Sequence, residues 1–264
     1  MADYTLAVSD AEITRYRMMA QQALAHEARQ LALAGITDGA IVADIGCGPA
    51  AMSVELASLV GPSGRVIGVE REDEALAAAR QVVAQANADN VQLVQGTAVE
   101  TGIPARSVDV VMLRHVLAHN GGDEQLIVDH LASLVRSGGA VYLVDVDLTA
   151  FRMLDIDADL EDMSERYAQF HASRGNDPRI GLRLGKLLAG AGLDVADFAG
   201  MFTIFPVWPG MRPPAWAARD AMLAQGVVNQ DDIDRWGAAF DRSDTAEVRP
   251  TIFAPMFIGI GRTP

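Results

Sequence analysis

Cysteine and basic side chains are scarce in this chain of 264 residues. Cys47 is the single cysteine, so no disulfide can form within the chain, and we expect the reducing environment of the cytoplasm. Lys and Arg number 21 against 35 Asp and Glu, which leaves a formal net charge of -14. The arginines are scattered rather than clustered, and such a surface repels phosphate. The composition therefore argues against a nucleic acid substrate and against an anionic membrane surface.

Long apolar runs are also missing. No stretch of about 18 uninterrupted apolar residues occurs, so we expect no membrane-spanning helix. Residues 1–10 carry acids and lack the apolar centre of a secretory signal, so we expect no leader there. Half of the residues are nevertheless hydrophobic, which is enough for a core, and the length suits one α/β domain.

Strand-like and helix-like segments alternate through the first half of the chain. Ser9 and Glu12 form the pattern of a capping box at the start of the first helix. Strands are expected at residues 40–45, 65–69, 90–95, 107–113 and 140–146, with a turn at 137–139. Helices are expected at residues 9–34, 50–60, 72–88 and 123–135. This alternation predicts a parallel sheet with right-handed crossovers. Later elements are expected as helices at 148–173, 179–191 and 216–240 and strands at 195–207 and 251–260.

The sharpest motif lies where the first strand ends. Residues 42–49 read Val-Ala-Asp-Ile-Gly-Cys-Gly-Pro, so a buried strand runs into a loop with Gly46 and Gly48, and a helix follows. Glycines let the backbone approach a ligand closely, and ligands of open α/β sheets lie at the carboxyl ends of the strands. Glu70 ends the second strand, where its carboxylate can accept hydrogen bonds from both ribose hydroxyls of an adenosine.

The glycine loop by itself fits two classes of cofactor. Gly46, Gly48 and Ala51, with an acid about twenty residues later, also satisfy the dinucleotide fingerprint. Asp44 favours S-adenosylmethionine, because its carboxylate would repel a pyrophosphate and attract the ammonium group of a methionine moiety. A helix before the first strand and a pair of strands at the end of the chain also favour S-adenosylmethionine.

Residues 44–48, Asp-Ile-Gly-Cys-Gly, resemble motif I of the class I S-adenosylmethionine-dependent methyltransferases. Glu70 is similar to the acid that ends their second strand, and residues 109–119 and 134–139 resemble their fourth strand and the glycine turn before their fifth. The resemblance covers residues 35–147 and is nearest to ubiquinone- and menaquinone-type and bacterial natural-product methyltransferases. It implies a Rossmann-like α/β fold with a seven-stranded, mostly parallel sheet and an antiparallel last strand.

This resemblance divides one domain into a helical lid (residues 1–38), a cofactor-binding core (39–147) and substrate-side helices with C-terminal strands (148–264). Thr97 departs from the family, because many members carry an acid there for the adenine amino group; its hydroxyl or the backbone of Ala98 would substitute. Arg114 would either contact the carboxylate of the cofactor or form an ion pair. The residues implied to bind S-adenosyl-L-methionine are Asp44, Gly46, Cys47, Gly48, Glu70, Arg71, Thr97, Ala98 and Arg114.

Methyl transfer from a sulfonium requires the nucleophile and the methyl group about 3 Å apart in a dry site, and a hydroxyl or ammonium nucleophile also needs a proton acceptor. His119, just past the fourth strand, is the candidate catalytic base because histidine titrates near neutral pH. Packing beneath the cofactor is its alternative role. A metal at His115, His119 and Asp123 would need a regular helix, which the following glycines disfavour, so no metal is expected. His171 lies in a helical stretch and is expected at the surface.

The methyl acceptor is expected to be a small, hydrophobic molecule. The Asn- or Asp-Pro-Pro-Tyr tetrad of DNA amino-methyltransferases is absent after the fourth strand, in line with the acidic charge. Two alternatives stay open: an NAD(P)-binding oxidoreductase, which Asp44 and the lack of a Tyr-x-x-x-Lys pair disfavour, and a non-catalytic cofactor-binding module. The helical insertions could support a homodimer. An apolar acceptor pocket or a packed core is expected from Met201, Phe202, Phe205, Trp208, Met211 and Trp216.

Overall fold

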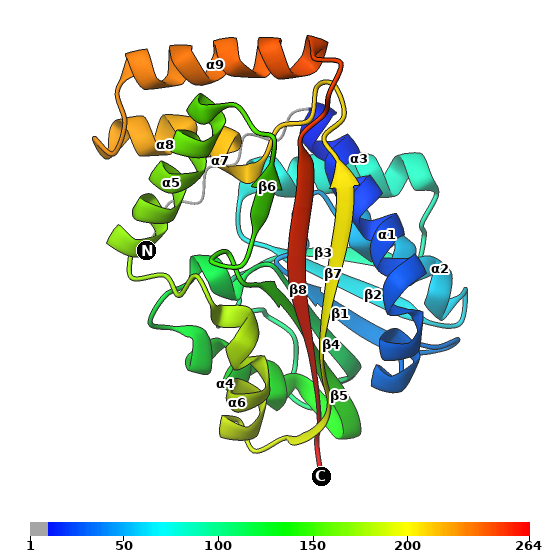
Figure 1. Cartoon of the computed structure of the whole chain (residues 1–264). Helices are drawn as coiled ribbons and strands as arrows, with labels where there is room; N and C mark the ends of the chain where they lie inside the picture. Colours follow the sequence, from blue (N-terminus) through cyan, green and yellow to red (C-terminus); the bar gives the residue numbers. More distant parts are fainter. Residues whose placement is uncertain (1–9) are drawn as a thin grey trace.

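A computed structural model describes residues 10–264 of the chain, in which helices cover a mixed β-sheet (Figure 1). The strands are β1 (Ile41–Ile45), β2 (Arg65–Glu70), β3 (Val91–Gln95), β4 (Val108–Arg114), β5 (Val135–Val146), β6 (Arg152–Leu154), β7 (Asp194–Pro206) and β8 (Thr251–Arg262). The α-helices are α1 (Asp10–Ala34), α2 (Ala51–Val60), α3 (Asp73–Ala86), α4 (Glu124–Leu134), α5 (Ala158–Ser173), α6 (Leu184–Gly190), α7 (Pro214–Ala217), α8 (Arg219–Ala224) and α9 (Gln230–Thr245). Two short 3-10 helices are η1 (Leu117–His119) and η2 (Ile180–Arg183).

The sheet has the predicted Rossmann-like architecture with one more strand than expected. Its order is β3-β2-β1-β4-β5-β8, with β7 along the other edge of β8, and the strands from β1 to β5 pair in parallel. Strand β8 runs antiparallel to both β5 and β7, as predicted for the last strand. The described chain therefore forms eight strands rather than seven, because the three-residue β6 also pairs with the start of β8.

The prediction of a helix from residue 148 is wrong for its first ten residues. The carboxylate of Asp147 accepts hydrogen bonds from the backbone N–H groups of Thr149 (2.8 Å) and Ala150 (3.2 Å), which closes a turn instead of a helix. The chain then forms β6, and α5 starts only at Ala158, where the Asp157 side chain caps its first turn. The Ser9 cap predicted for the first helix lies outside the described residues.

Two further boundaries differ from the sequence prediction. The turn expected at residues 137–139 lies inside β5, where the pairing with β4 shifts register and Gly138 takes a φ of +77°. The single helix expected at 216–240 is divided among α7, α8 and α9. Between α8 and α9, Gly226 has a φ of +68°, and a capping box of Asn229 and Asp232 starts α9. In both places a glycine in the left-handed region changes the direction of the chain.

Hydrophobic side chains fill both faces of the sheet. Helices α1 and α2 cover one face and α4 and α6 the other (Figure 1). Strand β4 shows why the sheet is continuously apolar, since Val110 and Met112 pack toward α1 and α2 while Val111 and Leu113 pack toward α4. No helix among residues 10–264 combines the length and the apolar character that crossing a membrane requires.

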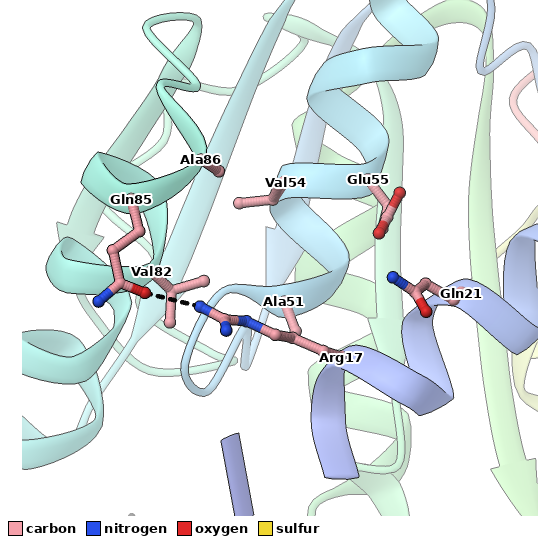
Figure 2. A pocket seen from close by; sticks show the side chains of 8 residues that line it. All are labelled: Arg17, Gln21, Ala51, Val54, Glu55, Val82, Gln85 and Ala86. Carbon is pink, nitrogen blue, oxygen red and sulfur yellow. Dashed lines mark hydrogen bonds between the residues drawn. The ribbon is translucent and has the colours of Figure 1, made fainter. Parts of the chain in front are cut away.

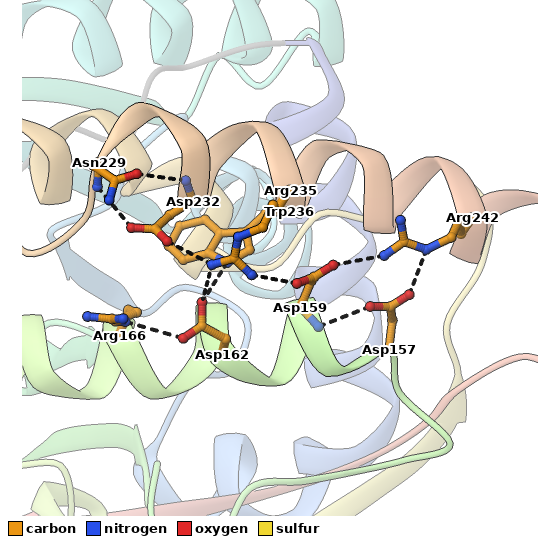
Figure 3. A network of polar contacts seen from close by, with 9 residues as sticks. All are labelled: Asp157, Asp159, Asp162, Arg166, Asn229, Asp232, Arg235, Trp236 and Arg242. Atoms are coloured by element: carbon orange, nitrogen blue, oxygen red, sulfur yellow. Dashed lines mark hydrogen bonds and ion pairs between the residues drawn. The ribbon is translucent and has the colours of Figure 1, made fainter.

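A helical cap, consisting of α5, α7, α8 and α9, stands beside one end of the sheet and has a hydrophobic cluster of its own (Figure 1). Trp236 is fully buried in this cluster, and its Nε1 donates to Asp162 on α5 at 3.1 Å. Figure 3 shows how arginines of α9 bind acids of α5: Arg235 contacts Asp159 and Asp162, and Arg242 contacts Asp159. The many acids of α5 therefore hold the cap together.

A buried ion pair fastens α1 to the centre of the sheet. Glu27 on α1 has no exposed surface, and its carboxylate accepts two hydrogen bonds from Arg114 at the end of β4 (2.6 and 2.9 Å) and one from the hydroxyl of Tyr142 on β5 (2.7 Å). Burial alone would lower the pKa of Arg114, but the adjacent Glu27 raises it above its ordinary value. The guanidinium is therefore charged, and Glu27 is its main compensating partner, with smaller contributions from Tyr142 and Asp44.

Replacing Glu27 should destabilise the protein strongly. Glu27→Ala leaves the Arg114 guanidinium buried without its partner, so we expect a loss of about 3–5 kcal/mol in the free energy of unfolding. Urea denaturation followed by circular dichroism measures the change. Arg29→Ala is the matched control on the same helix, because Arg29 is exposed and lies 3.5 Å from Asp197, and it should cost about 1 kcal/mol or less. Equal effects of the two variants would contradict the buried-pair interpretation.

Candidate functional site

The loop after β1 packs closely against neighbouring strands and still presents open backbone. The N–H groups of Gly46 and Cys47 both donate to the carbonyl of Val69 on β2 (2.8 and 3.0 Å). Gly46 has a φ of +69°, and a Cβ at this position would lie 2.6 Å from a methyl group of Val116. Gly48 has a φ of +54° with no atom within 4 Å of a Cβ position. Gly46 thus permits tight packing, whereas Gly48 leaves space in which a ligand can approach the backbone.

Glu70 connects the end of β2 to this loop. It is 9% exposed, and its Oε2 accepts a hydrogen bond from the N–H of Gly48 (3.0 Å). Its Oε1 accepts from the N–H groups of Arg71 (2.7 Å) and Glu72 (3.0 Å). Each carboxylate oxygen can accept more than one hydrogen bond, so the side chain keeps capacity for a pair of ligand hydroxyls. The backbone bonds hold it in a fixed orientation beside the open glycine.

Asp44 is a buried carboxyl group beneath the loop. It is 3% exposed, and the Ser53 hydroxyl donates to its Oδ2 at 2.6 Å. Burial raises the pKa of Asp44 to about 6, against the lowering effects of the Ser53 hydrogen bond and of Arg114. Because burial disfavours the charged form of Asp44, a cationic ligand beside it would stabilise that form strongly. Burial likewise raises the pKa of the neighbouring Cys47 thiol, so the sulfur stays protonated and serves as packing.

The other predicted cofactor residues occupy different environments. Thr97, just after β3, has a buried Oγ1 without a hydrogen-bond partner, and Ala98 packs against the core cluster on the α4 face. Arg71 forms an ion pair with Glu72 at 2.9 Å. Both terminal nitrogens of Arg114 are occupied by Glu27. The side chain of Arg114 is therefore already satisfied within the protein, and its contact with a cofactor stays a prediction.

His119 stands at the end of η1, over the carboxyl edge of the sheet. The carboxylate of Asp145, 1% exposed at the end of β5, accepts a hydrogen bond from the N–H of Ala118 (3.2 Å) and so holds η1 in place. Burial, followed by the nearby His171 and Arg174, lowers the pKa of His119 to about 3. The expectation that His119 titrates near neutral pH is therefore wrong for this arrangement, and its ring is neutral above about pH 4.

Sequence reasoning missed the contribution of α5 to this region. His171, predicted at the surface, is 2% exposed, and its ring centroid lies 5.0 Å from that of His119 and 4.4 Å from that of Tyr167. Tyr167 and His171 are four residues apart on one helix, so they share a face. That spacing was visible in the sequence, but nothing in the sequence indicated that this face turns toward η1.

The structure also bears on two other side-chain clusters singled out in the sequence. His115 has a φ of +55°, so the segment from His115 to His119 is not a regular helix, and residues 10–264 contain no group of three His, Cys, Asp or Glu side chains arranged to hold a metal. The side chains expected to form either an apolar acceptor pocket or a packed core do not all lie together. Phe202 is 63% exposed on β7, whereas Trp216 packs edge-on against Phe240 inside the cap.

A surface hollow of about 310 Å³ lies between α1, α2 and α3 (Figure 2). Arg17 extends across it and donates to the side-chain oxygen of Gln85 at 2.8 Å. Ala51, at the start of α2, is its nearest lining residue in sequence to the glycine loop, and none of the predicted site residues lines it. The hollow is thus separate from the Asp44–Glu70 site.

Comparisons with known proteins agree with this geometry. Residues 36–192 match the sequence profile of a family described as a methyltransferase domain. Over 110 residues the chain is 30% identical to a demethylmenaquinone methyltransferase of Listeria monocytogenes serotype 4a, a match covering 42% of this chain and 46% of that protein. The chain thus spans about half the length of this curated relative.

Solved structures share the fold across a larger part of the chain. A candidate methyltransferase from Bacillus halodurans C-125 superposes with a TM-score of 0.59 at 15% identity, covering 91% of this chain and 99% of that one. A SAM-dependent methyltransferase from Aquifex aeolicus superposes with a TM-score of 0.51 at 16% identity, covering 73% and 93%. These two structures, the family match and the strand order all agree with the resemblance that the sequence motifs indicated. The chain belongs to the methyltransferase-domain family, with the Rossmann-like fold of the class I enzymes that use S-adenosyl-L-methionine.

Proposed function

We propose that this protein is an enzyme that transfers the methyl group of S-adenosyl-L-methionine to a small organic acceptor. The observation that carries the proposal is the pairing of a buried carboxyl group, Asp44, with the open backbone at Gly48 and the oriented carboxylate of Glu70. Two acids at the strand ends suit a ligand with an ammonium group and a ribose. They disfavour the pyrophosphate of a dinucleotide, because like charges repel strongly where water is excluded.

The residues present fit each part of this cofactor. Asp44 would hold the ammonium group of the methionine moiety, and Glu70 would accept hydrogen bonds from the ribose hydroxyls. Thr97 Oγ1 is buried without a partner, so a hydrogen bond to the adenine would satisfy it. Gly48 would let the backbone lie against the ligand. These assignments explain why polar groups are buried at this edge of the sheet.

The chemical work of the protein is to position the acceptor, exclude water and receive a proton. The cofactor supplies an activated methyl group on a positively charged sulfur. Asp145 fixes η1 through the N–H of Ala118, and η1 carries His119. The neutral ring of His119 can accept a proton from the acceptor in this buried setting. Because its pKa is about 3, acid inactivation near neutral pH would arise from other groups, of which Asp44 is one.

Several features support a small acceptor. The ring of His119 packs against the buried His171 of α5, which in turn contacts Tyr167, so one side of this region is formed by the helical cap, an arrangement suited to enclosing a small molecule. The net charge of -14 disfavours a nucleic acid substrate. The Listeria monocytogenes relative is named for demethylmenaquinone, a small molecule. The dispersal of the predicted aromatic pocket gives no support to the finer expectation of a hydrophobic acceptor.

Calorimetry tests the cofactor assignment. The purified protein should bind S-adenosylmethionine and S-adenosylhomocysteine and should not bind NADH. Glu70→Ala should weaken both sulfur ligands by about 1–3 kcal/mol, because a buried hydrogen-bonding partner of the ribose is lost. Binding of NADH but of neither sulfur ligand would favour the oxidoreductase alternative and overturn the proposal.

The affinity for S-adenosylmethionine should depend on pH through Asp44. A cation beside this group favours its charged form, so binding lowers a pKa that stands at about 6 in the free protein. Affinity should therefore be constant above about pH 7 and fall by up to about tenfold per pH unit below pH 6. Asp44→Asn should bind weakly at every pH, without this dependence. An unchanged pH profile in Asp44→Asn would show that another group is responsible.

The same substitution should stabilise the free protein. The carboxyl group is harder to ionise in the folded state than its ordinary value of 3.8, so ionisation of Asp44 at pH 8 opposes folding by roughly 3 kcal/mol. Asp44→Asn should raise the melting temperature at pH 8, with a gain that shrinks as the pH falls through 6 and toward 4. Loss of stability at pH 8 would mean that Asp44 is compensated already in the free protein.

His119→Ala should separate catalysis from cofactor binding. We expect S-adenosylhomocysteine affinity within about threefold of the unaltered protein, and a turnover reduced by about 10²–10⁴-fold if the ring accepts the proton. Release of S-adenosylhomocysteine in the presence of an acceptor measures turnover. His26→Ala is a control, because His26 is exposed on α1. Unchanged turnover in His119→Ala would assign this histidine to packing.

A further inference from the structure

Three buried polar atoms without hydrogen-bond partners lie close to the carboxyl edge of the sheet. In the described part of the chain, four side-chain nitrogen or oxygen atoms are buried in this way, and one of them, on Asp109, still has an ion pair with Arg136. The other three are Thr97 Oγ1, His115 Nε2 and His171 Nε2. Buried polar groups are normally paired, so each of these atoms is a candidate for completion by a ligand. The proposed cofactor accounts for Thr97 but not for His171.

The hydrogen bonds around His171 determine which of its nitrogens carries the proton. Asn176 accepts a hydrogen bond from the N–H of Gly121 through its Oδ1 (3.0 Å), so its Nδ2 is the atom facing His171. Nδ2 can only donate, and it lies 2.8 Å from His171 Nδ1. Nδ1 is therefore the acceptor, and the proton of the neutral ring is on Nε2. The Nε2 atom of His171 is thus a hydrogen-bond donor; the backbone of Ala118 lies near the ring and raises its pKa, but it gives Nε2 no hydrogen bond of normal geometry.

Arg174 extends the same face of α5. Tyr167, His171 and Arg174 follow one another at intervals of four and three residues, which places them along one side of the helix and its last turn. The Arg174 guanidinium lies 5.2 Å from the ring centroid of Phe170. Among residues 12–264, Arg174 is the one half-buried basic side chain with neither an ion pair nor a hydrogen bond from its guanidinium. This is unusual in a chain with an excess of fourteen acids.

We propose that His171 and Arg174 form a subsite that binds a carboxylate of the methyl acceptor. The subsite offers an N–H donor and a guanidinium and no acceptor, so it suits anionic oxygens and rejects ammonium or amide N–H groups. The ring contact between His171 and His119 puts it next to the candidate base. The acceptor class is therefore a small carboxylic acid whose nucleophile reaches His119. The assignment rests on the proposed function, because the acceptor is defined by that reaction.

The electrostatics of the region agree with this assignment. After burial, Arg174 lowers the pKa of His171, which falls to about 4. Arg174 also lowers the pKa of His119, where burial and His171 have larger effects. The charge of Arg174, which adds to the effect of burial on both imidazoles, would be offset by a bound carboxylate. Binding of an acidic acceptor would accordingly raise the pKa of His119 and make it a stronger base at the moment when it is needed.

Sodium benzoate and benzamide, which have similar shapes and differ in charge, are suitable probes. The full chain is saturated with S-adenosylhomocysteine, and calorimetry or thermal shift is recorded with each probe at matched ionic strength. We expect benzoate to bind at millimolar concentration and at least about tenfold more tightly than benzamide. Arg174→Gln should abolish this preference, and Arg174→Lys should retain part of it. Arg179→Gln, at an exposed arginine five residues further on, should keep the preference.

The outcomes separate the subsite from the proposed function. Equal binding of benzoate and benzamide, no binding of benzoate at millimolar concentration, or an unchanged preference in Arg174→Gln would each overturn the subsite. Two controls are required: S-adenosylhomocysteine must bind all variants alike, and circular dichroism must show that they are folded. If Arg174→Gln fails to fold, Arg174→Lys replaces it in the test. Failure of the unaltered protein to bind S-adenosylhomocysteine would instead overturn the proposed function.

Discussion

The ion pair between Glu27 and Arg114 is the contact on which the arrangement of the site depends. Arg114 ends β4, next to the end of β1, and its charge also lowers the pKa values of Asp44 and Asp145 against the raising effect of burial. These two acids have different roles, since Asp44 faces the proposed cofactor and Asp145 holds η1. One guanidinium thus partly offsets the burial of several carboxyl groups at a single edge of the sheet, in addition to their own hydrogen bonds, and Glu27 keeps that guanidinium in place through α1.

The cofactor half of the fold was predictable from local sequence because its signals are local. The strand that ends in Gly46 and Gly48, the acid at Glu70 and the regular alternation of elements each follow from neighbouring residues. Backbone geometry at two glycines and a family-like motif therefore sufficed to predict the sheet and the position of the loop. The extra strand β6 escaped prediction because its apolar partner residues lie about a hundred positions later, at the start of β8.

The acceptor side was less predictable because its side chains come together only through packing. His171 was expected at the surface because it lies in a helical stretch. The acids of that helix instead bind arginines of α9, and another face of α5 turns toward η1. The low pKa of His119 likewise depends on burial against α5, which no short motif encodes. Arg114 was recognised as important, but its partner on α1 lies 87 residues away in sequence. Long-range contacts of this kind leave no periodic signal.

The separate hydrophobic cluster of the helical cap has a consequence for how this protein could change over evolutionary time. Trp236 and its neighbours are buried among α5, α7, α8 and α9 and share no member with the clusters that flank the sheet. Substitutions that reshape the cap would therefore leave the packing around Asp44 and Glu70 intact, since effects at distant, independent sites are nearly additive. The cap could therefore change to accommodate new acceptors while the cofactor-binding half stays constant. We expect related chains to diverge most in the cap.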